Sequence, residues 1–540
     1  MSDAATLSAG DAPPPEREND APASAAAPHP PLQGMALVLG TLSLSLATFM
    51  NVLDSSIANV SLPAIAGDLG VSPQQGTWVI TSFGVANAIS VPLTGWLTQR
   101  FGAVRLFTAS VLLFVLTSWL CGFAWSLETL VFFRVLQGAV AGPMIPLSQT
   151  LLLASYPVAR AGMALAMWGM TTLVAPVVGP LLGGWITDNI AWPWIFYINV
   201  PVGIVAAALT WSLYRHRETP TRKLPIDTIG LSLLVLWVGA LQLMLDKGKE
   251  LDWFASGEII TMAVVAVVGL AVFLVWELTD EHPVVDLRLF GQRNFAFGVV
   301  ALSVAYGLFF GNVVLLPLWL QQYMGYTATA AGMALAPVGV LAIALTPLAG
   351  RKVSHWDPRT MATVAFIVFS LVLWMRAQFT TETSLIQIII PTVIQGAAMS
   401  FFFIPLTTIT LSNLPHHRIP AAAGLSNFVR ITAGAMGTSI ATTWWDSRAS
   451  LHHAHLTEAL VAGQGVFAQT LEKMTAAGLS HEQALVQINR MIDQQAYTRA
   501  ADDIFLGSAY VFLGLIMLIW LTSRPGPTVG DGSPGASAAH

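Results

Sequence analysis

Fourteen apolar segments, each about long enough to cross a lipid bilayer, dominate this sequence. A spanning helix needs roughly 20 consecutive apolar residues. The chain of 540 residues is 55% hydrophobic and only 10% charged, whereas soluble domains carry roughly a quarter charged residues. The sequence therefore predicts an all-α integral membrane protein with 14 transmembrane helices, at residues 36–62, 75–97, 104–124, 128–152, 162–186, 193–213, 229–245, 258–277, 295–320, 329–350, 359–378, 385–411, 420–444 and 503–522.

Lysine and arginine residues are distributed unevenly between the predicted loops. If the N-terminus is cytoplasmic, the loops after even-numbered segments and the C-terminal tail contain fourteen of them. The external loops then contain only Lys247, Lys249 and Arg376. Because basic residues accumulate on the cytoplasmic side of membrane proteins, we expect both termini in the cytoplasm. A single cysteine, Cys121, excludes an intramolecular disulfide.

Motifs that recur about 258 residues apart indicate two similar halves. Gln137 and Gly138 recur as Gln395 and Gly396, and both segments end in Ile-Pro-Leu. Such repeats are typical of secondary transporters, whose halves rock around a central site. The predicted organisation is a disordered cytoplasmic tail (1–33), a six-helix half (34–215), inserted helices 7 and 8 (216–292), a second six-helix half (293–523) that includes an external segment (446–502), and a disordered cytoplasmic tail (524–540).

The first apolar segment contains one acidic residue, Asp54. An ionised carboxylate in hydrocarbon is costly, so such residues usually face a cavity and have a function. We expect the other segments to build a water-accessible cavity around a proton-binding Asp54, with Asn59 on the same wet surface. The alternative is that Asp54 pairs with a basic residue and only holds helices together.

Other polar residues in the apolar segments have a transport interpretation and a packing interpretation. Arg134, the only basic residue in the first six segments, either modulates Asp54 or forms an ion pair that fixes the packing. Arg430 either holds anionic substrates or pairs across the bundle. Gln137 and Gln395 either face the cavity or hydrogen-bond to a neighbouring helix.

Aromatic and methionine side chains form adaptable apolar surfaces that suit varied ligands, although many such side chains face lipid or core. Residues 446–502 are either a docking surface for a periplasmic partner or a solvated insertion. Histidines at 416–417 and 452–455 lack cysteines nearby, and we expect no metal site there. The predicted substrate-binding residues are Asn59, Gln137, Tyr306, Phe310, Asn312, Gln395, Met399, Phe402, Asn427 and Arg430.

Five motifs together resemble the fourteen-span drug:proton antiporters of the major facilitator superfamily. Gln99 stands where that family has an acid, so we expect no charge relay there. The motifs are the loop from Gly95 to Gly102 with Arg100, the string from Arg134 to Gly138, residues 53–63 around Asp54, residues 192–201, and residues 175–185 with Pro176, Gly179, Pro180, Gly183 and Gly184.

The resemblance covers nearly the whole chain apart from the tails, and it points to the EmrB-type multidrug efflux pumps. It implies the major facilitator fold and a proton-coupled antiporter that exports hydrophobic drugs or toxic compounds across the bacterial inner membrane by alternating access. Asp54 and Arg134 would couple protons, and the loop and glycine-proline motifs would control conformation.

The same resemblance implies a set of partners. The proton motive force would be the energy source, with no cofactor and no nucleic acid. A periplasmic adaptor (EmrA-like) and an outer-membrane channel (TolC-like) would complete a tripartite pump. Export of an endogenous fatty acid or siderophore remains an alternative, as does a membrane-embedded lipid-modifying enzyme. No glycine-rich phosphate loop is present, so ATP hydrolysis is not expected.

Overall fold

The computed structural model describes residues 30–524 except 72, 158–159, 223–224, 226, 249, 282, 353–355, 416–417 and 463. Residues 1–30 form a separate unit, of which only Pro30 is described, and the account below concerns the unit that begins at Pro31. The two predicted tails, 1–33 and 524–540, therefore fall almost entirely outside the described residues.

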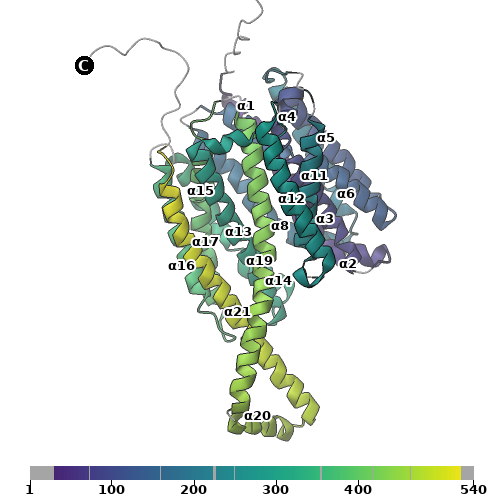
Figure 1. Ribbon diagram of the computed structural model, residues 1–540, viewed down its shortest axis with the longest axis vertical. Coiled ribbons are helices and arrows are strands. Elements are labelled where there is room, and N and C mark those ends of the chain that lie inside the picture. The colour runs from purple at the N-terminus through teal and green to yellow at the C-terminus, as the bar shows by residue number, and fades with distance from the viewer. Residues whose placement is uncertain are drawn as a thin grey trace, which may run out of the picture. The chain divides into compact units, whose positions relative to one another are not determined.

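Every element of the described chain is helical (Figure 1). The first group of helices is α1 (Gly34–Asp68), α2 (Pro73–Gly76), α3 (Trp78–Ser90), α4 (Thr94–Phe101), α5 (Ala103–Gly122), α6 (Leu127–Ala141), α7 (Met144–Ser155), α8 (Ala161–Asn189), α9 (Trp194–Tyr197) and α10 (Asn199–Tyr214). Next come α11 (Thr228–Lys247), η2 (Trp253–Ala255), α12 (Gly257–Thr279) and η3 (Leu287–Gly291). The remainder is α13 (Arg293–Gln322), α14 (Ala328–Leu335), α15 (Val338–Lys352), α16 (Pro358–Arg376), α17 (Leu385–Ser400), α18 (Phe403–Leu411), α19 (Ile419–Ala462), α20 (Gln464–Ala476) and α21 (His481–Trp520).

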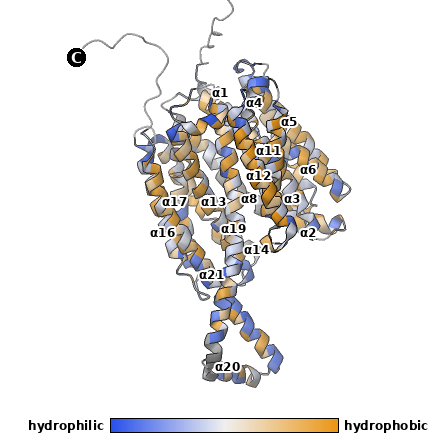
Figure 2. Cartoon of the chain, in the orientation of Figure 1, coloured by the Kyte–Doolittle hydropathy of each residue, from blue (hydrophilic) through white to orange (hydrophobic). Residues whose placement is uncertain are grey.

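Within the described residues, eleven helical segments are long and apolar enough to cross a membrane, or twelve if α3 and α4 form one span. Each of the fourteen predicted segments coincides with one of these segments or with α8 or α19, which are not among the eleven. The prediction of an all-α, multi-pass membrane protein is confirmed. Figure 2 shows hydrophobic residues along the outer faces of the packed helices.

Proline lies at three of the places where a predicted segment divides into two helices. Helices α3 and α4 meet at a 62° bend at Pro92. Pro143 lies between α6 and α7, and Pro337 lies between α14 and α15. Proline has no backbone N–H and its ring clashes with the preceding turn, so the helix breaks or kinks there. In a membrane such breaks persist only where neighbouring helices or water satisfy the freed carbonyls.

The same packing pattern occurs early and late in the chain. Helix α1 packs on α8 and α10, and α13 packs on α19 and α21. Likewise α5 packs on α6 and α10, and α16 packs on α17 and α21. Helices α11 and α12 pack on each other, and α11 contacts α3 and α19. This pattern agrees with two six-helix halves and an inserted pair, although the predicted boundaries themselves stay a prediction.

Helices α19 and α21 extend beyond the other helices and are joined there by α20 (Figure 1). An ion pair and a hydrogen bond hold the extended parts together. Arg448 Nη2 lies 2.5 Å from Asp503 Oδ2, and His452 Nε2 is hydrogen-bonded to the same oxygen at 2.8 Å. The segment predicted at 446–502 is thus a helical hairpin continuous with two long helices. We call the part from Asp446 to Asp502 the helical hairpin below.

Glycines allow close contact at two equivalent helix interfaces. On α8, a Cβ at Gly179 would lie 2.6 Å from the Ser56 hydroxyl, and a Cβ at Gly183 would lie 2.7 Å from Ile57 of α1. On α13, a Cβ at Gly307 would lie 2.7 Å from the Ala433 carbonyl oxygen of α19. Small residues at such positions let membrane helices approach closely. Pro176, Pro180 and Gly184 also lie in α8.

We expect Gly307→Ala to lower the thermal unfolding midpoint of the purified protein. The added methyl group must displace α13 from α19, and overpacking of this kind costs about 1–3 kcal/mol. The matched control is Gly239→Ala on α11, where no atom lies within 4 Å of the new Cβ. That control should leave the midpoint unchanged or slightly raised, because alanine favours helix. Equal midpoints for the two variants would contradict the packing account.

Candidate functional site

Asp54 lies at the centre of a buried network of hydrogen bonds. Its Oδ2 atom accepts a bond of 2.6 Å from Arg134 Nη1. Its Oδ1 atom accepts from the side-chain amide nitrogens of Gln137 (Nε2) at 3.1 Å and Asn199 (Nδ2) at 2.8 Å. Gln137 also donates to the Ser118 hydroxyl at 2.7 Å. Side chains from four helices, α1, α5, α6 and α10, are therefore joined in one network around this carboxylate.

Arg134 is fixed on every side. Its Nε donates to the Val79 carbonyl oxygen at 2.9 Å, and its Nη1 also donates to Gln137 Oε1 at 2.6 Å. The guanidinium carbon lies 4.2 Å from the ring centre of Phe83 and 5.5 Å from that of Phe196. Cations over aromatic faces are attracted by the ring quadrupole, more strongly where water is excluded. The arginine is therefore held by charge, hydrogen bonds and aromatic rings together.

The network has no exposed surface in this structure. Asp54, Arg134 and Gln137 are each 0% exposed. The expectation that Asp54 borders a water-accessible cavity is therefore wrong for this conformation. The physical reason is that Arg134 and two amides satisfy the carboxylate, so water is not needed. Asn59, expected on the same wet surface, is exposed one and a half turns further along α1.

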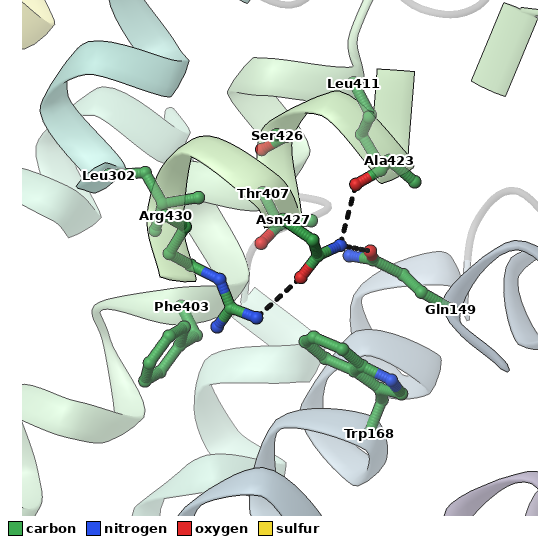
Figure 3. Close-up of a pocket in the computed structure, with 10 residues that line it drawn as sticks. All are labelled: Gln149, Trp168, Leu302, Phe403, Thr407, Leu411, Ala423, Ser426, Asn427 and Arg430. Carbon is green, nitrogen blue, oxygen red and sulfur yellow. Dashed lines mark hydrogen bonds between the residues drawn. The ribbon is translucent and has the colours of Figure 1, made fainter. Parts of the chain in front are cut away.

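A second site is a cavity lined by residues from helices far apart in the sequence (Figure 3). Its empty volume is about 270 Å³. Gln149 of α7 and Trp168 of α8 line one side, and Phe403 of α18 with Asn427 and Arg430 of α19 line the other. Asn427 Nδ2 donates to Gln149 Oε1 at 3.2 Å, and Arg430 Nη2 donates to Asn427 Oδ1 at 2.5 Å. We call this the central pocket.

Arg430 points into an aromatic environment. Its guanidinium carbon lies 4.6 Å from the ring centre of Tyr306, 5.8 Å from that of Phe403 and 6.0 Å from that of Trp168. No acidic side chain of the described residues forms an ion pair with it. The cation is buried and held by π faces and one amide. A site of this kind suits amphipathic ligands with an apolar body and a polar or anionic end.

Polar side chains of α1 between Asp54 and the central pocket bond to neighbouring helices. Asn51, one turn before Asp54 on α1, donates to a backbone carbonyl of α6 at 3.2 Å. Thr48, a further turn away, donates to the Ser148 hydroxyl of α7 at 2.8 Å. Ser148 accepts at 3.0 Å from Nε1 of Trp168, which lines the pocket. Among the described residues no hydrogen bond joins the Asp54, Asn51 and Thr48 side chains to one another, so a change at Asp54 would reach the pocket through movement of α1 as a whole.

The predicted substrate-binding residues divide between several locations. Tyr306 lies against Arg430 and stacks on Phe310 with ring centres 4.5 Å apart. Phe402 and Met399 are buried in an apolar cluster with residues of α13, α16 and α21. Gln137 belongs to the Asp54 network. Asn312 and Gln395 line a different cavity, discussed in the last Results subsection.

The loop motif forms the contact between α4 and the chain segments around it. A Cβ at Gly95 would lie 2.7 Å from the Ala421 Cβ, so glycine permits close approach of α19. Arg100 lies over the Trp96 ring, 5.6 Å from its centre. Gly102 has a φ of +88°, a conformation that favours glycine. Glu218 accepts from the first backbone N–H groups of α5 there, at 3.0 and 2.9 Å.

The sequence analysis missed three residues of these sites. Asn199 and Ser118 complete the Asp54 network, and Arg376 was counted as an external-loop residue. Arg376 is instead the last residue of α16, only 2% exposed. The repeat could have shown that Arg376 belongs to a helix. Arg376 stands 258 positions after Ser118, as Gln395 stands 258 positions after Gln137.

Comparison with known proteins identifies the family. The model of the Major Facilitator Superfamily matches residues 44–438. The chain is a member of the major facilitator superfamily. It is therefore a transporter by family, and a multi-pass membrane protein.

Several relatives of this major facilitator protein are similar over almost their full length. It is 53% identical over 497 residues to the multidrug export protein EmrB of Haemophilus influenzae, covering 92% of this chain and 98% of the relative. It is 52% identical to EmrB of Escherichia coli K12, covering 93% and 98%. It is 49% identical to the fatty acid resistance protein FarB of Neisseria gonorrhoeae, covering 93% and 99%. These identities place the chain in the EmrB-type branch.

A solved structure supports the fold independently. The proton:xylose symporter XylE superposes with a TM-score of 0.53 at 14% identity, covering 89% of this chain and 96% of that one. At such low identity the likeness concerns the fold alone. Together with the family match, it confirms the major facilitator fold predicted from the sequence.

The Asp54–Arg134 pair should show strong coupling in a double-mutant cycle. Removing one partner of a buried ion pair typically costs about 3–5 kcal/mol, because it leaves an uncompensated charge. We expect Arg134→Met alone to lower the unfolding midpoint more than Arg134→Met combined with Asp54→Asn, where no charge remains. Thermal unfolding in detergent measures both. Additive losses from the two substitutions would contradict direct pairing.

Proposed function

We propose that this protein is a proton-coupled antiporter that exports hydrophobic compounds across the bacterial inner membrane, with both termini in the cytoplasm. The observation that carries the proposal is the buried ion pair of Arg134 with Asp54 on α1, a helix whose Thr48 is joined through Ser148 to Trp168 of a pocket between early and late helices. Export of drugs is also what the names of the EmrB relatives state of those proteins.

Protonation of Asp54 would remove the negative charge that organises the network. Arg134 would lose its counter-charge, and the amides of Gln137 and Asn199 would lose an anionic acceptor. Helices α6 and α10 would then be held less tightly to α1. Because α1 also packs on α8, which contributes Trp168 to the central pocket, proton binding and substrate binding would favour different arrangements. Such a difference in affinity between two states is what coupling requires.

The energy available from one proton is sufficient for useful export. The membrane potential supplies about 2.3 kcal/mol per charge per 100 mV. One proton per cycle can therefore support a roughly fiftyfold gradient of a neutral substrate at about 100 mV.

Arg430 favours a second candidate function, the export of an endogenous amphipathic carboxylate. The FarB relative is named a fatty acid resistance protein. In the described residues Arg430 has aromatic neighbours and an amide but no acidic partner, so a fatty carboxylate could place its charge there. A transport profile confined to such carboxylates would favour this function over drug export.

The helical hairpin is the proposed docking surface for a periplasmic adaptor of the EmrA type, with a TolC-type channel beyond it. It extends past the packed helices, on the side opposite to the described end of α21 at Trp520 (Figure 1). If both termini are cytoplasmic, the hairpin stands in the periplasm.

Substrate-driven proton release in proteoliposomes tests the proposed coupling. Wild-type protein should release protons when substrate is added, and Asp54→Asn should abolish the release while substrate binding is retained. The matched control is Asp68→Asn on the same helix. Asp68 accepts from Trp192 Nε1 at 2.8 Å and lies outside the network, so this variant should couple normally. Normal coupling by Asp54→Asn would place the proton site elsewhere.

Shortening the helical hairpin tests the partner. A short glycine-serine connection in place of residues 456–488 leaves the Arg448–Asp503 and His452–Asp503 contacts intact. We expect co-purification with a co-expressed adaptor to be lost, while the thermal unfolding midpoint stays near that of the wild type. Adaptor binding by the shortened protein would refute the docking role.

A further inference from the structure

Arg376 is a buried cation without a counter-charge in the described structure. It ends α16 and is 2% exposed. Its Nη2 atom donates to Gln395 Oε1 at 2.6 Å and to Thr392 Oγ1 at 3.3 Å, both neutral groups on α17. Its Nε atom is buried and has no hydrogen-bond partner. The guanidinium therefore lacks both charge neutralisation and a full set of acceptors.

No acidic residue is placed to neutralise it. The sequences of α13, α17 and α18 contain no Asp or Glu. Helix α21, which packs on α16, contains Asp502 and Asp503, but Asp503 binds Arg448. In the described part of the chain no ion pair joins either acid to Arg376. Because arginine stays protonated in proteins, the positive charge persists.

The N-terminal half shows how the same scaffold neutralises an arginine. Asp54, Ser118, Arg134 and Gln137 are separated by the same 258 positions from Asn312, Arg376, Thr392 and Gln395, respectively. In the N-terminal half the arginine and the glutamine lie on one helix, α6. In the C-terminal half Arg376 lies on α16 and Gln395 on the neighbouring α17, and Asn312 stands at the position that corresponds to Asp54. Asn312 bonds Ser508 of α21 at 3.1 Å, as Asp54 bonds Asn199 of α10. The second cluster thus keeps the arginine and loses the carboxylate.

A cavity lies where the missing negative charge is needed. Arg376, Gln395 and Asn312 line it together with apolar side chains that include Phe309 and Phe512. Besides Arg376 Nε, the Oδ1 atom of Asn312 is buried there without a partner. A small anion in this cavity would accept a hydrogen bond from Arg376 Nε and would also supply the missing negative charge.

We propose that this cavity binds a monovalent anion, which supplies the charge that Asp54 supplies in the other half. Intramembrane charges are expensive unless they are paired, and a cation among neutral donors and apolar walls suits a small, weakly hydrated anion. The ligand is either chloride from solution or the carboxylate end of an amphipathic molecule. The site is separate from Arg430 and the central pocket, and the proposal does not depend on which substrates are exported.

The test compares purified full-length protein in sodium chloride and in sodium gluconate at equal ionic strength, without substrate. A ligand that binds only the folded state raises the thermal unfolding midpoint in a saturable way. We expect such a rise with chloride for the wild type, and binding of radioactive chloride that saturates over the same range. Gluconate, which is too large for the cavity, should give no rise.

Two variants and one control locate the effect. Arg376→Gln removes the cation and should abolish the response to chloride. Asn312→Asp supplies a carboxylate at the position equivalent to Asp54, so it should also abolish the response while it raises the unfolding midpoint in gluconate. Arg359→Gln, which removes an arginine of the same helix that is already paired with Asp357, should keep the full response. If Arg376→Gln fails to fold, the response of Asn312→Asp to chloride still tests the proposal.

Each outcome has a defined meaning. A wild type equally stable in both salts and in octanoate would overturn the proposal and leave water in the cavity. So would a chloride response that survives in folded Asn312→Asp. A response to octanoate but not to chloride, lost in Asn312→Asp, would support the site with a carboxylate as its ligand. None of these outcomes depends on coupling at Asp54, so failure of the two proposals can be distinguished.

Discussion

The buried ion pair between Asp54 and Arg134 constrains the packing of the whole N-terminal half. Neither charge can face hydrocarbon alone without a large penalty. Each must therefore find partners, and these come from α3, α5, α6 and α10 as well as α1. A carboxylate with two amide donors and one arginine donor specifies one arrangement of these helices. The close glycine contacts of α8 on α1 then fix a sixth helix to the same core.

The second half shows that the scaffold does not require the charge. The equivalent helices α13, α16, α17 and α21 pack in the same pattern, although Asn312 stands at the position of Asp54. Van der Waals packing, with Phe369 stacked on Phe512 at 5.0 Å between ring centres, holds these helices instead. Both halves pack in the same pattern, but only the N-terminal half has the carboxylate. Function therefore explains the Asp54 carboxylate better than stability does.

Much of the fold followed from the sequence, because the bilayer requires long apolar segments and these are easily counted. The sequence from Arg134 to Gly138 and its repeat at Gln395 also located the buried hydrogen-bond networks of the two halves. The contacts themselves could not be predicted. Whether Asp54 faced water or Arg134 depended on the rotation of α1 against α6, which the weakly amphipathic sequence of α1 does not encode. Arg376 was misplaced because a charge near a segment end looks the same in sequence whether it points outward or into the bundle.

The contrast between interfaces indicates which parts can move against each other. Within each half, glycine contacts such as Gly183 with Ile57 and Gly307 with Ala433 leave no room for sliding. Between the halves, a glycine contact and an amide hydrogen bond illustrate the interactions. Gly95 meets Ala421 at the start of α19, and Asn427 shares one amide bond with Gln149 across the central pocket. These two contacts can separate without breaking an ion pair. Motion of two rigid halves about the pocket therefore costs less than rearrangement within a half. In the proposed mechanism, protonation of Asp54 would act by shifting α1 together with α8.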